Sequence, residues 1–296
     1  MDQFLQAIIN GVMLGGFYAA MVLGFSVIWG VMGVINLAHG EFLMMGAYLT
    51  WVLDKIFGWD AFAALIVVIP VMFVVGVLVQ LVLINRVVER PHLVSLLVTF
   101  GLGIAIANAT KLIFGADPRI TDTAISGFWR LGDTVTVPVT KFAITGVALA
   151  MMATLYSFLQ YTRLGKSIRA AAQNKEAARM VGIEINLVYV LTFGICIALT
   201  GAAGMLVSTT QAVFPFMGPP FTLKAFAITA MAGLGNIPGA LLGGIILGLV
   251  EVFIGIYIPG IGTNLGIVAS YLLLVLILVT RPQGLFGGLK PATEVR

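Results

Sequence analysis

The sequence predicts an all-α fold, a polytopic transmembrane helical bundle of about eight or nine spans. Of the 296 residues, 60% are hydrophobic and only 9% are charged, whereas a soluble domain needs roughly a quarter of its residues charged. Apolar runs near the roughly 20 residues that cross a bilayer recur along the chain. The basic residues gather in the loops between these runs. We therefore expect one membrane domain over residues 1–296 and no soluble domain.

Eight apolar runs are long enough to be expected as spans, and charged or turn-forming residues set their ends. In order, they are Phe4–Trp29, Leu37–Leu53, Ala61–Ile84, Leu93–Phe114, Phe142–Leu159, Leu187–Val207, Pro238–Ile258 and Gly266–Thr280. The first should remain in the mature protein, because "MDQFLQAIINGVML" lacks a basic start and a cleavage site. A shorter run, Phe221–Leu234, leads into "GLGNIPG", whose glycines and proline interrupt a helix. A broken or half helix is therefore expected near 221–240, although a short true span is favoured.

The distribution of charge predicts the topology. Loop 161–186 holds five basic residues, and cytoplasmic loops collect Lys and Arg, so this loop is predicted to be cytoplasmic. The same rule places "NRVVERPH" (85–92) and the C-terminal tail, with Arg281, Lys290 and Arg296, on that side. Loop 115–141 has balanced charge and is predicted to be extracytoplasmic, with a small hairpin at "DTVTVPV". Counting spans back from loop 161–186 then places the N-terminus outside.

Loop 161–186 should contain a short helix. Asn174 can accept hydrogen bonds from the free N–H groups at its start, and Glu176 suits the positive helix end. Arg179 lies three residues after Glu176, and Gly182 can end the helix as a left-handed residue. A solvated connector is the other interpretation, but a connector need not be about 26 residues long. Alanines flanked by charges are instead typical of a segment that inserts into a groove on a partner.

Three stretches together resemble a known family. "EAARMVG" (Glu176–Gly182) matches the EAA-x3-G pattern of ABC-importer permeases. The run that begins "NKEAARMVGIEINLVYV", the run "VINLAHGEFLMMGAYLTW" and the run "KAFAITAMAGLGNIPGALLGGIILGLVE" are similar to the branched-chain amino acid permease family of the LivH/LivM type, here LivH. The likeness covers nearly the whole chain. The Ile-x-Leu-Pro ending of some other importer permeases is absent after Gly182, which favours this branch.

The resemblance implies an ABC importer. The chain would be the single transmembrane permease domain (1–296) in a bacterial or archaeal cytoplasmic (inner) membrane, pairing with a second homologous permease of the LivM type. Two cytoplasmic ABC ATPase subunits, which bind ATP and Mg²⁺, would grip loop 161–186 as the coupling loop. An extracytoplasmic substrate-binding protein would deliver a branched-chain or related amino acid; close relatives move urea or short amides. The implied ATPase-coupling residues are Asn174, Glu176, Ala177, Ala178, Arg179 and Gly182.

Other function classes find little support. "GKS" at Gly165–Ser167 lacks the first glycine of a phosphate-binding loop, because position 160 is Gln160, so ATP should be hydrolysed on partner subunits. HExxH and GxSxG motifs are absent from the sequence, so we expect no enzyme. The single Cys196 predicts neither a disulfide nor a metal site. The pI near 9.3 reflects loop charges rather than nucleic-acid binding. A stand-alone secondary transporter remains the alternative, although mid-membrane charge is scarce.

Four polar residues are candidates for the translocation path. Asn36, His39 and Glu41 begin an otherwise apolar span, and ionisable groups inside a membrane are costly. The other interpretation is a polar helix start at the interface, with Asn36 as its cap. His39 and Glu41 are two residues apart and should face different sides of a helix. Glu251 either lines the path or bonds to a neighbouring helix.

Lys224 and a set of glycines complete the predictions. Lys224 follows "PPFT", and we expect it to snorkel to the interface rather than bind a substrate carboxylate. Small residues recur every four positions, a spacing that lets membrane helices approach closely. The predicted helix-packing residues are Gly235, Gly239, Gly243, Gly244 and Gly248, with the same spacing at Gly11 and Gly15.

Overall fold

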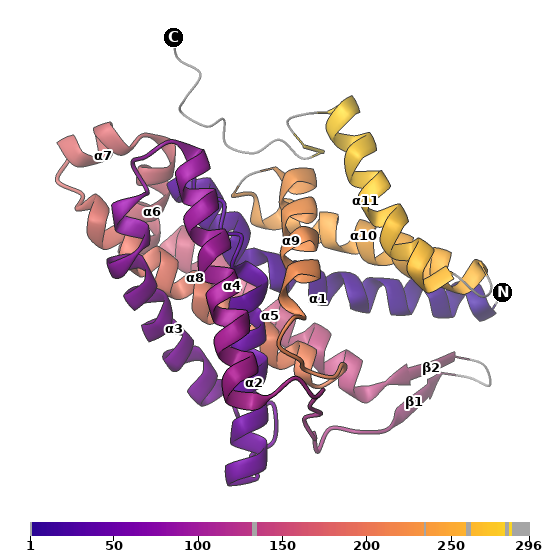
Figure 1. The fold of residues 1–296 in the computed structure, drawn as a ribbon. Coiled ribbons are helices and arrows are strands. Elements are labelled where there is room, and N and C mark those ends of the chain that lie inside the picture. Colours follow the sequence, from indigo (N-terminus) through magenta and orange to yellow (C-terminus); the bar gives the residue numbers. More distant parts are fainter. Residues whose placement is uncertain (1, 132–134, 234, 259–261, 282–283, 286–296) are drawn as a thin grey trace.

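The computed structural model describes residues 2–131, 135–233, 235–258, 262–281 and 284–285. Helices dominate these residues (Figure 1). In chain order the elements are α1 (Asp2–Met32), α2 (His39–Phe57), α3 (Leu65–Val82), η1 (Ile84–Arg86), α4 (His92–Phe114), β1 (Phe128–Leu131), β2 (Val135–Pro138), α5 (Val139–Tyr161), α6 (Arg163–Gln173), α7 (Lys175–Met180), α8 (Ile185–Ser208), α9 (Gly218–Ala232), α10 (Ile237–Tyr257) and α11 (Gly262–Thr280).

The helical membrane bundle predicted from the sequence is confirmed, with fewer full-length spans. Within the described ranges, six helices are long and apolar enough to cross a membrane, namely α1, α3, α4, α5, α8 and α10. The prediction was eight or nine. The difference lies in α2, which carries Glu41, Asp54 and Lys55, in the 15-residue α9, and in the short apolar part of α11. These three helices still belong to the bundle.

Helix α8 lies within the bundle and packs against α1, α2 and α3. Glycine makes these contacts close. A Cβ on Gly46 of α2 would collide with the backbone of Gly201 in α8, and one on Gly24 of α1 would collide with Cys196. Helices in lipid associate through such backbone proximity, because the hydrophobic effect does not drive them together there. Cys196 is itself buried as a small core residue.

Helices α1 and α10 form the most extensive helix pair. Gly11 faces Leu249, and Gly15 faces Ile245, so the two helices run antiparallel. Gly244 and Gly248, two of the predicted packing glycines, lie against this surface: a Cβ on Gly244 would come 2.7 Å from the Gly15 oxygen, and one on Gly248 would come 2.6 Å from the Gly11 oxygen.

The other three predicted packing glycines lie elsewhere. Gly243 faces Ile228 of α9, and a Cβ on Gly243 would lie 3.4 Å from the nearest Ile228 atoms, which is an ordinary van der Waals contact. Gly239 lies in the first turn of α10 and is enclosed by Ala232 and Asn236. Gly235 is outside the helix, in the turn before α10, with φ of +70°. It therefore does not share a helical ridge with the others.

The loops separate into two ends of the bundle. We call the first the α7 end. Here α7 contacts the turn between η1 and α4 through Glu89, and Leu285 N–H donates to Met231 at the end of α9. The two loops with basic residues, 85–92 and 161–186, thus lie together as predicted. Leu285 is also at this end; Lys290 and Arg296 lie outside the described residues.

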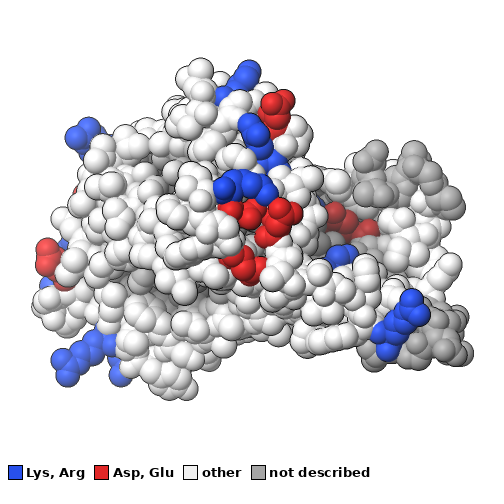
Figure 2. Space-filling model, turned by 90° about the horizontal axis from the view of Figure 1, so that it is seen from below, with Lys and Arg blue, Asp and Glu red and all other residues white. Residues whose placement is uncertain are grey.

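The opposite end, which we call the hairpin end, carries the predicted β-hairpin. Strands β1 and β2 pair antiparallel, with Trp129 opposite Val137. Gln6 of α1 exchanges two hydrogen bonds with the Thr136 backbone, at 2.9 and 3.0 Å. The start of α1 therefore lies opposite α7, as predicted, although the side of the membrane on which each end lies remains a prediction. Figure 2 shows a mostly uncharged face with charged side chains confined to small clusters.

Two helices begin inside the bundle rather than at an end. The chain turns back after α1, and the ring of His39 at the start of α2 reaches the Met21 carbonyl, 11 residues before the end of α1 at Met32. From the hairpin end, residues 209–217 likewise return inward to α9. Gly40 of α2 lies against Gly218 at the start of α9.

The half helix predicted near 221–240 is thus α9, which ends at Ala232 before α10 begins at Ile237; its 15 residues are about 22 Å long. The favoured prediction, a true span over Phe221–Leu234, is wrong in this respect. Helix α9 nevertheless ends at the α7 end. Residues 209–217 run from the hairpin end into the bundle, and α9 continues from there to the α7 end.

Candidate functional site

Local sequence determines the shape of α7. The Asn174 side chain accepts hydrogen bonds from the N–H groups of Glu176 and Ala177, both at 3.0 Å. This confirms the predicted N-cap. At the other end, Gly182 has φ of +85°, its N–H donates to the Arg179 carbonyl, and Ile183 N–H donates to Ala178. That pair of bonds is the Schellman arrangement, which glycine favours.

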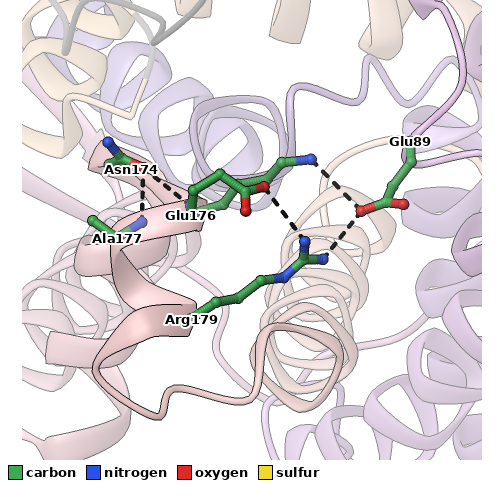
Figure 3. Close-up of polar contacts among 6 residues, drawn as sticks. Glu89, Asn174, Glu176, Ala177 and Arg179 are labelled. Carbon is green, nitrogen blue, oxygen red and sulfur yellow. Dashed lines mark hydrogen bonds and ion pairs between the residues drawn. The ribbon is translucent and has the colours of Figure 1, made fainter.

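Charged side chains connect α7 to the turn before α4 (Figure 3). Arg179 donates to a Glu89 oxygen at 3.1 Å and to Glu176 at 3.4 Å, while Lys175 lies 3.6 Å from the same Glu89 oxygen. Glu89 was missed by sequence analysis, because it is 90 residues from Arg179 in the chain. The one available signal was that its loop shares the predicted side with α7.

The outer surface of α7 is apolar as well as charged. Met180 and Val181 are 87% and 77% exposed, although they lie beside charged residues at the end of the bundle. Ala177 is exposed, whereas Ala178 is buried against the protein. Of the two alanines predicted to face a partner, only Ala177 is therefore accessible, and Ala178 anchors α7 to the bundle instead.

The Glu89 contacts predict a pH dependence of α7. The hydrogen bond from Arg179, together with nearby Lys175, lowers the pKa of Glu89 below its ordinary value of 4.5. A group whose pKa is lowered on folding stabilises the structure above its ordinary pKa, and this contribution is lost as pH falls through the folded-state pKa. Hydrogen-exchange protection factors of the α7 amides should therefore decrease below pH 4.5, by a small amount because the pair is exposed.

The Glu89→Gln variant serves as the control for this measurement. Its α7 protection should already be lower at neutral pH and should lack the decrease associated with Glu89. An identical pH profile in the two proteins would show that Glu89 does not hold α7.

The start of α2 is the second polar region. Asn36, His39 and Glu41 are 1%, 0% and 5% exposed, so they lie within the bundle and not at an interface. His39 Nε2 lies 3.0 Å from the Met21 carbonyl of α1; because a carbonyl only accepts, this nitrogen carries the proton. Glu41 instead fills the space beside Gly103 of α4 and Gly218 of α9. The prediction that His39 and Glu41 face different sides is confirmed.

Other side chains cap α2, so the prediction of Asn36 as its cap is wrong. The N-cap position is Ala38, and Asn36 accepts from Ala38 N–H inside the preceding turn. Thr222 of α9 accepts from Gly40 N–H at 2.8 Å, and Thr99 of α4 accepts from Leu37 N–H at 3.1 Å. Two neighbouring helices thereby satisfy N–H groups that would otherwise be costly to bury.

A third region is a buried ion pair. Lys224 of α9 lies 3.0 Å from both carboxylate oxygens of Glu251 on α10, and the two side chains are 10% and 16% exposed. Tyr18 of α1 donates to Glu251 at 2.8 Å and accepts from Lys224. The prediction that Lys224 snorkels to the interface is wrong, because an opposite charge on α10 compensates it within the bundle.

Glu251 also borders a cavity of about 490 Å³ between α1, α5, α8 and α10. Thr210 and Gln211, which follow α8, and Lys141, in the first turn of α5, line it as well. The cavity is therefore near the hairpin end. Of the two interpretations of Glu251, a bond to a neighbouring helix is confirmed. Glu251 also borders this cavity, whereas Asn36, His39 and Glu41 do not, and a place for any of the four on the translocation path stays a prediction. No cluster of three metal-ligating side chains occurs among the described residues.

Comparisons with known proteins give a consistent result. The family model for the permease component of branched-chain amino acid transport systems matches residues 7–280. The high-affinity branched-chain amino acid permease LivH of Escherichia coli K12 is 31% identical over 304 residues, covering 98% of this chain and 97% of that one. BraD of Pseudomonas aeruginosa is 30% identical with the same coverage. The probable LivH of Methanocaldococcus jannaschii is 27% identical and covers 90% of this chain and 87% of its own.

Proposed function

This chain belongs to the family of permease components of branched-chain amino acid transport systems, and we propose that it is the membrane-spanning subunit of an ABC importer. It would translocate branched-chain or related amino acids with energy from separate ATPase subunits. The names of its relatives support the substrate class. The α7 end would be cytoplasmic and the hairpin end extracytoplasmic, in agreement with the basic residues of loops 85–92 and 161–186.

The geometry of α7 is the observation that carries this proposal. A capped, six-residue helix at one end of an apolar bundle exposes Met180, Val181 and Ala177. Exposed apolar residues rimmed by charges mark protein interaction sites. Helix α7 leads directly through Gly182 into α8, which packs against three other helices. Motion of an ATPase that holds α7 would therefore reach α1, α2 and α3 through α8.

The remaining partners follow from the same proposal. Two cytoplasmic ATPases, which bind ATP and Mg²⁺, would each engage a coupling loop, one of them on a second homologous permease of the LivM type. A substrate-binding protein would dock at the hairpin end. The proposed coupling residues are Asn174, Glu176, Ala177, Arg179 and Gly182. Ala178 would hold α7 in place by packing against the bundle.

Replacing Gly182 with leucine tests the coupling role. Leucine at φ of +85° is strained by about 1–2 kcal/mol, so α7 should shift and ATP-driven leucine uptake should fall to background. Glu176→Lys should reduce uptake in the same direction, because it opposes the helix dipole and repels Arg179. Uptake is measured in cells that contain the full transporter, with membrane abundance determined in parallel.

Gly58→Leu is the matched control. Gly58 also has a left-handed conformation, with φ of +63° and open space around it, but it ends α2 far from α7. This variant should keep its uptake. Normal uptake by both Gly182→Leu and Glu176→Lys would refute the coupling role of α7.

One observation favours a second candidate, a stand-alone secondary transporter. The buried pair of Lys224 and Glu251 is of the kind that ion-coupled transporters carry near the middle of the membrane. The purified chain in liposomes separates the two functions. Accumulation of amino acid there without nucleotide or other proteins would establish the secondary transporter and exclude the importer.

A further inference from the structure

The cavity near the hairpin end contains two charged side chains of opposite sign. Glu251 borders it from α10, and Lys141 borders it from the first turn of α5. Lys141 is exposed, and none of the ion pairs among the described residues includes its ammonium group. The charge of Lys141 is therefore available to a ligand.

Glu251 retains acceptor capacity despite its partners. An ionised carboxylate offers about four lone-pair positions. Lys224 and Tyr18 occupy three of them, two from Lys224 and one from Tyr18. Because Glu251 is also partly exposed to the cavity, a small cationic group can approach it there without displacing Lys224.

Apart from the uncharged polar residues Asn10, Thr210 and Gln211, the remaining wall is apolar. Met13 and Phe17 of α1, Leu206 of α8, and Val252 and Ile256 of α10 line it. A volume of about 490 Å³ is within the range of small-molecule sites, which combine an apolar lining with a few placed polar groups. The cavity is thus matched to a compact ligand that is apolar apart from two opposite charges.

We infer that this cavity binds an amino acid zwitterion with an aliphatic side chain. Glu251 receives the α-ammonium group, Lys141 receives the α-carboxylate, and the side chain packs against Phe17, Leu206 and Val252. This site rests on the proposed function, because it would be a binding site for substrate that enters an importer permease from the hairpin end. A ligand without the carboxylate leaves Lys141 unpaired, and a ligand without the ammonium loses the bond to the remaining acceptor position of Glu251.

Cysteine labelling tests the site directly. Ile256→Cys places a thiol on the cavity wall at a position that is 40% exposed in the native protein, whereas the native Cys196 is 1% exposed. The full chain carrying Ile256→Cys is purified in lipid nanodiscs and reacted with a small maleimide. Leucine should slow the reaction by the factor 1 + [leucine]/Kd, about twofold at half-occupancy. Isoamylamine, without the carboxylate, and 4-methylpentanoate, without the ammonium, should protect much less.

Lys141→Gln in the Ile256→Cys background provides the decisive variant. Lys141 is exposed, so its replacement should leave the fold intact while abolishing protection by leucine. Lys141→Arg should retain protection. Lys111→Gln is the matched control, because Lys111 lies on α4 beside Phe216 and does not line the cavity. The proposal would be overturned if leucine gave no protection up to its solubility limit. It would also be overturned if either singly charged analogue protected as well as leucine does.

This experiment also separates the two proposals. Labelling requires neither ATPase nor binding protein, so protection by leucine can be observed even if the chain is not coupled to ATP. Conversely, loss of uptake in Gly182→Leu combined with unprotected labelling of Ile256→Cys would retain the importer and reject the cavity as its substrate site.

Discussion

Replacing Lys224 with methionine should cost the folded protein about 3 kcal/mol, the lower end of the range for a broken buried ion pair, because it leaves without a counter-charge a Glu251 carboxylate that is 16% exposed and borders a cavity. The native pair is held by contacts of 3.0 Å to both oxygens of Glu251. Tyr18 alone cannot neutralise the remaining charge. We expect a marked decrease in the thermal unfolding midpoint of the purified protein and in its abundance in the membrane.

The double replacement Lys224→Met with Glu251→Leu should recover most of this loss. An apolar pair of similar volume avoids the desolvation of both charges, and such replacements are often neutral or stabilising. Tyr18→Phe added to the pair removes the hydroxyl that would otherwise lose both partners. If the double variant is as unstable as the sum of the single variants, the pair does not act as a unit, and its role in joining α1, α9 and α10 is refuted.

The partners of Lys224 in this ion pair could not be predicted from the sequence. Lys224 was placed at the interface because an isolated lysine in an apolar segment extends to water. Its partner Glu251 is 27 residues away, and Tyr18 is 206 residues away, so only the packing of three helices brings them together. By contrast, Asn174 and Gly182 act on backbone groups within three or four residues. Their roles in shaping α7 could therefore be predicted from local sequence.

The same distinction holds for the spans. Hydropathy locates α3, α4 and α8 because their length and composition match the bilayer. Hydropathy cannot show that α2 and α9 begin inside the bundle. The N–H groups near the start of α2 are satisfied by Thr99 of α4 and Thr222 of α9, and these contacts form only when the helices pack together. The polarity of Asn36, His39 and Glu41 was visible in the sequence, but their burial depends on these tertiary contacts.

Gly15→Leu should produce the other large effect, a loss of correctly folded protein from the membrane. A Cβ at Gly15 would collide with the Ile245 backbone of α10. Overpacked cores usually lose about 1–3 kcal/mol, and the cost here should be higher because the obstacle is backbone rather than a flexible side chain. Helices α1 and α10 form the largest helix interface, so separating them should also disturb the cavity that they share. Abundance in the membrane and the thermal unfolding midpoint measure the effect.

Gly146→Leu on α5 is the matched control, since a Cβ there meets no atom within 4 Å. Both variants add the same side chain to a helix and remove the same glycine flexibility, and leucine has the higher helix propensity. Any difference between them therefore reports the close approach of α1 to α10. Equal stability of the two variants would show that Gly15 tolerates a side chain, and the two helices would then not be in contact through their glycines. A stable Gly15→Leu protein that failed to transport would instead show that this close contact forms during the transport cycle.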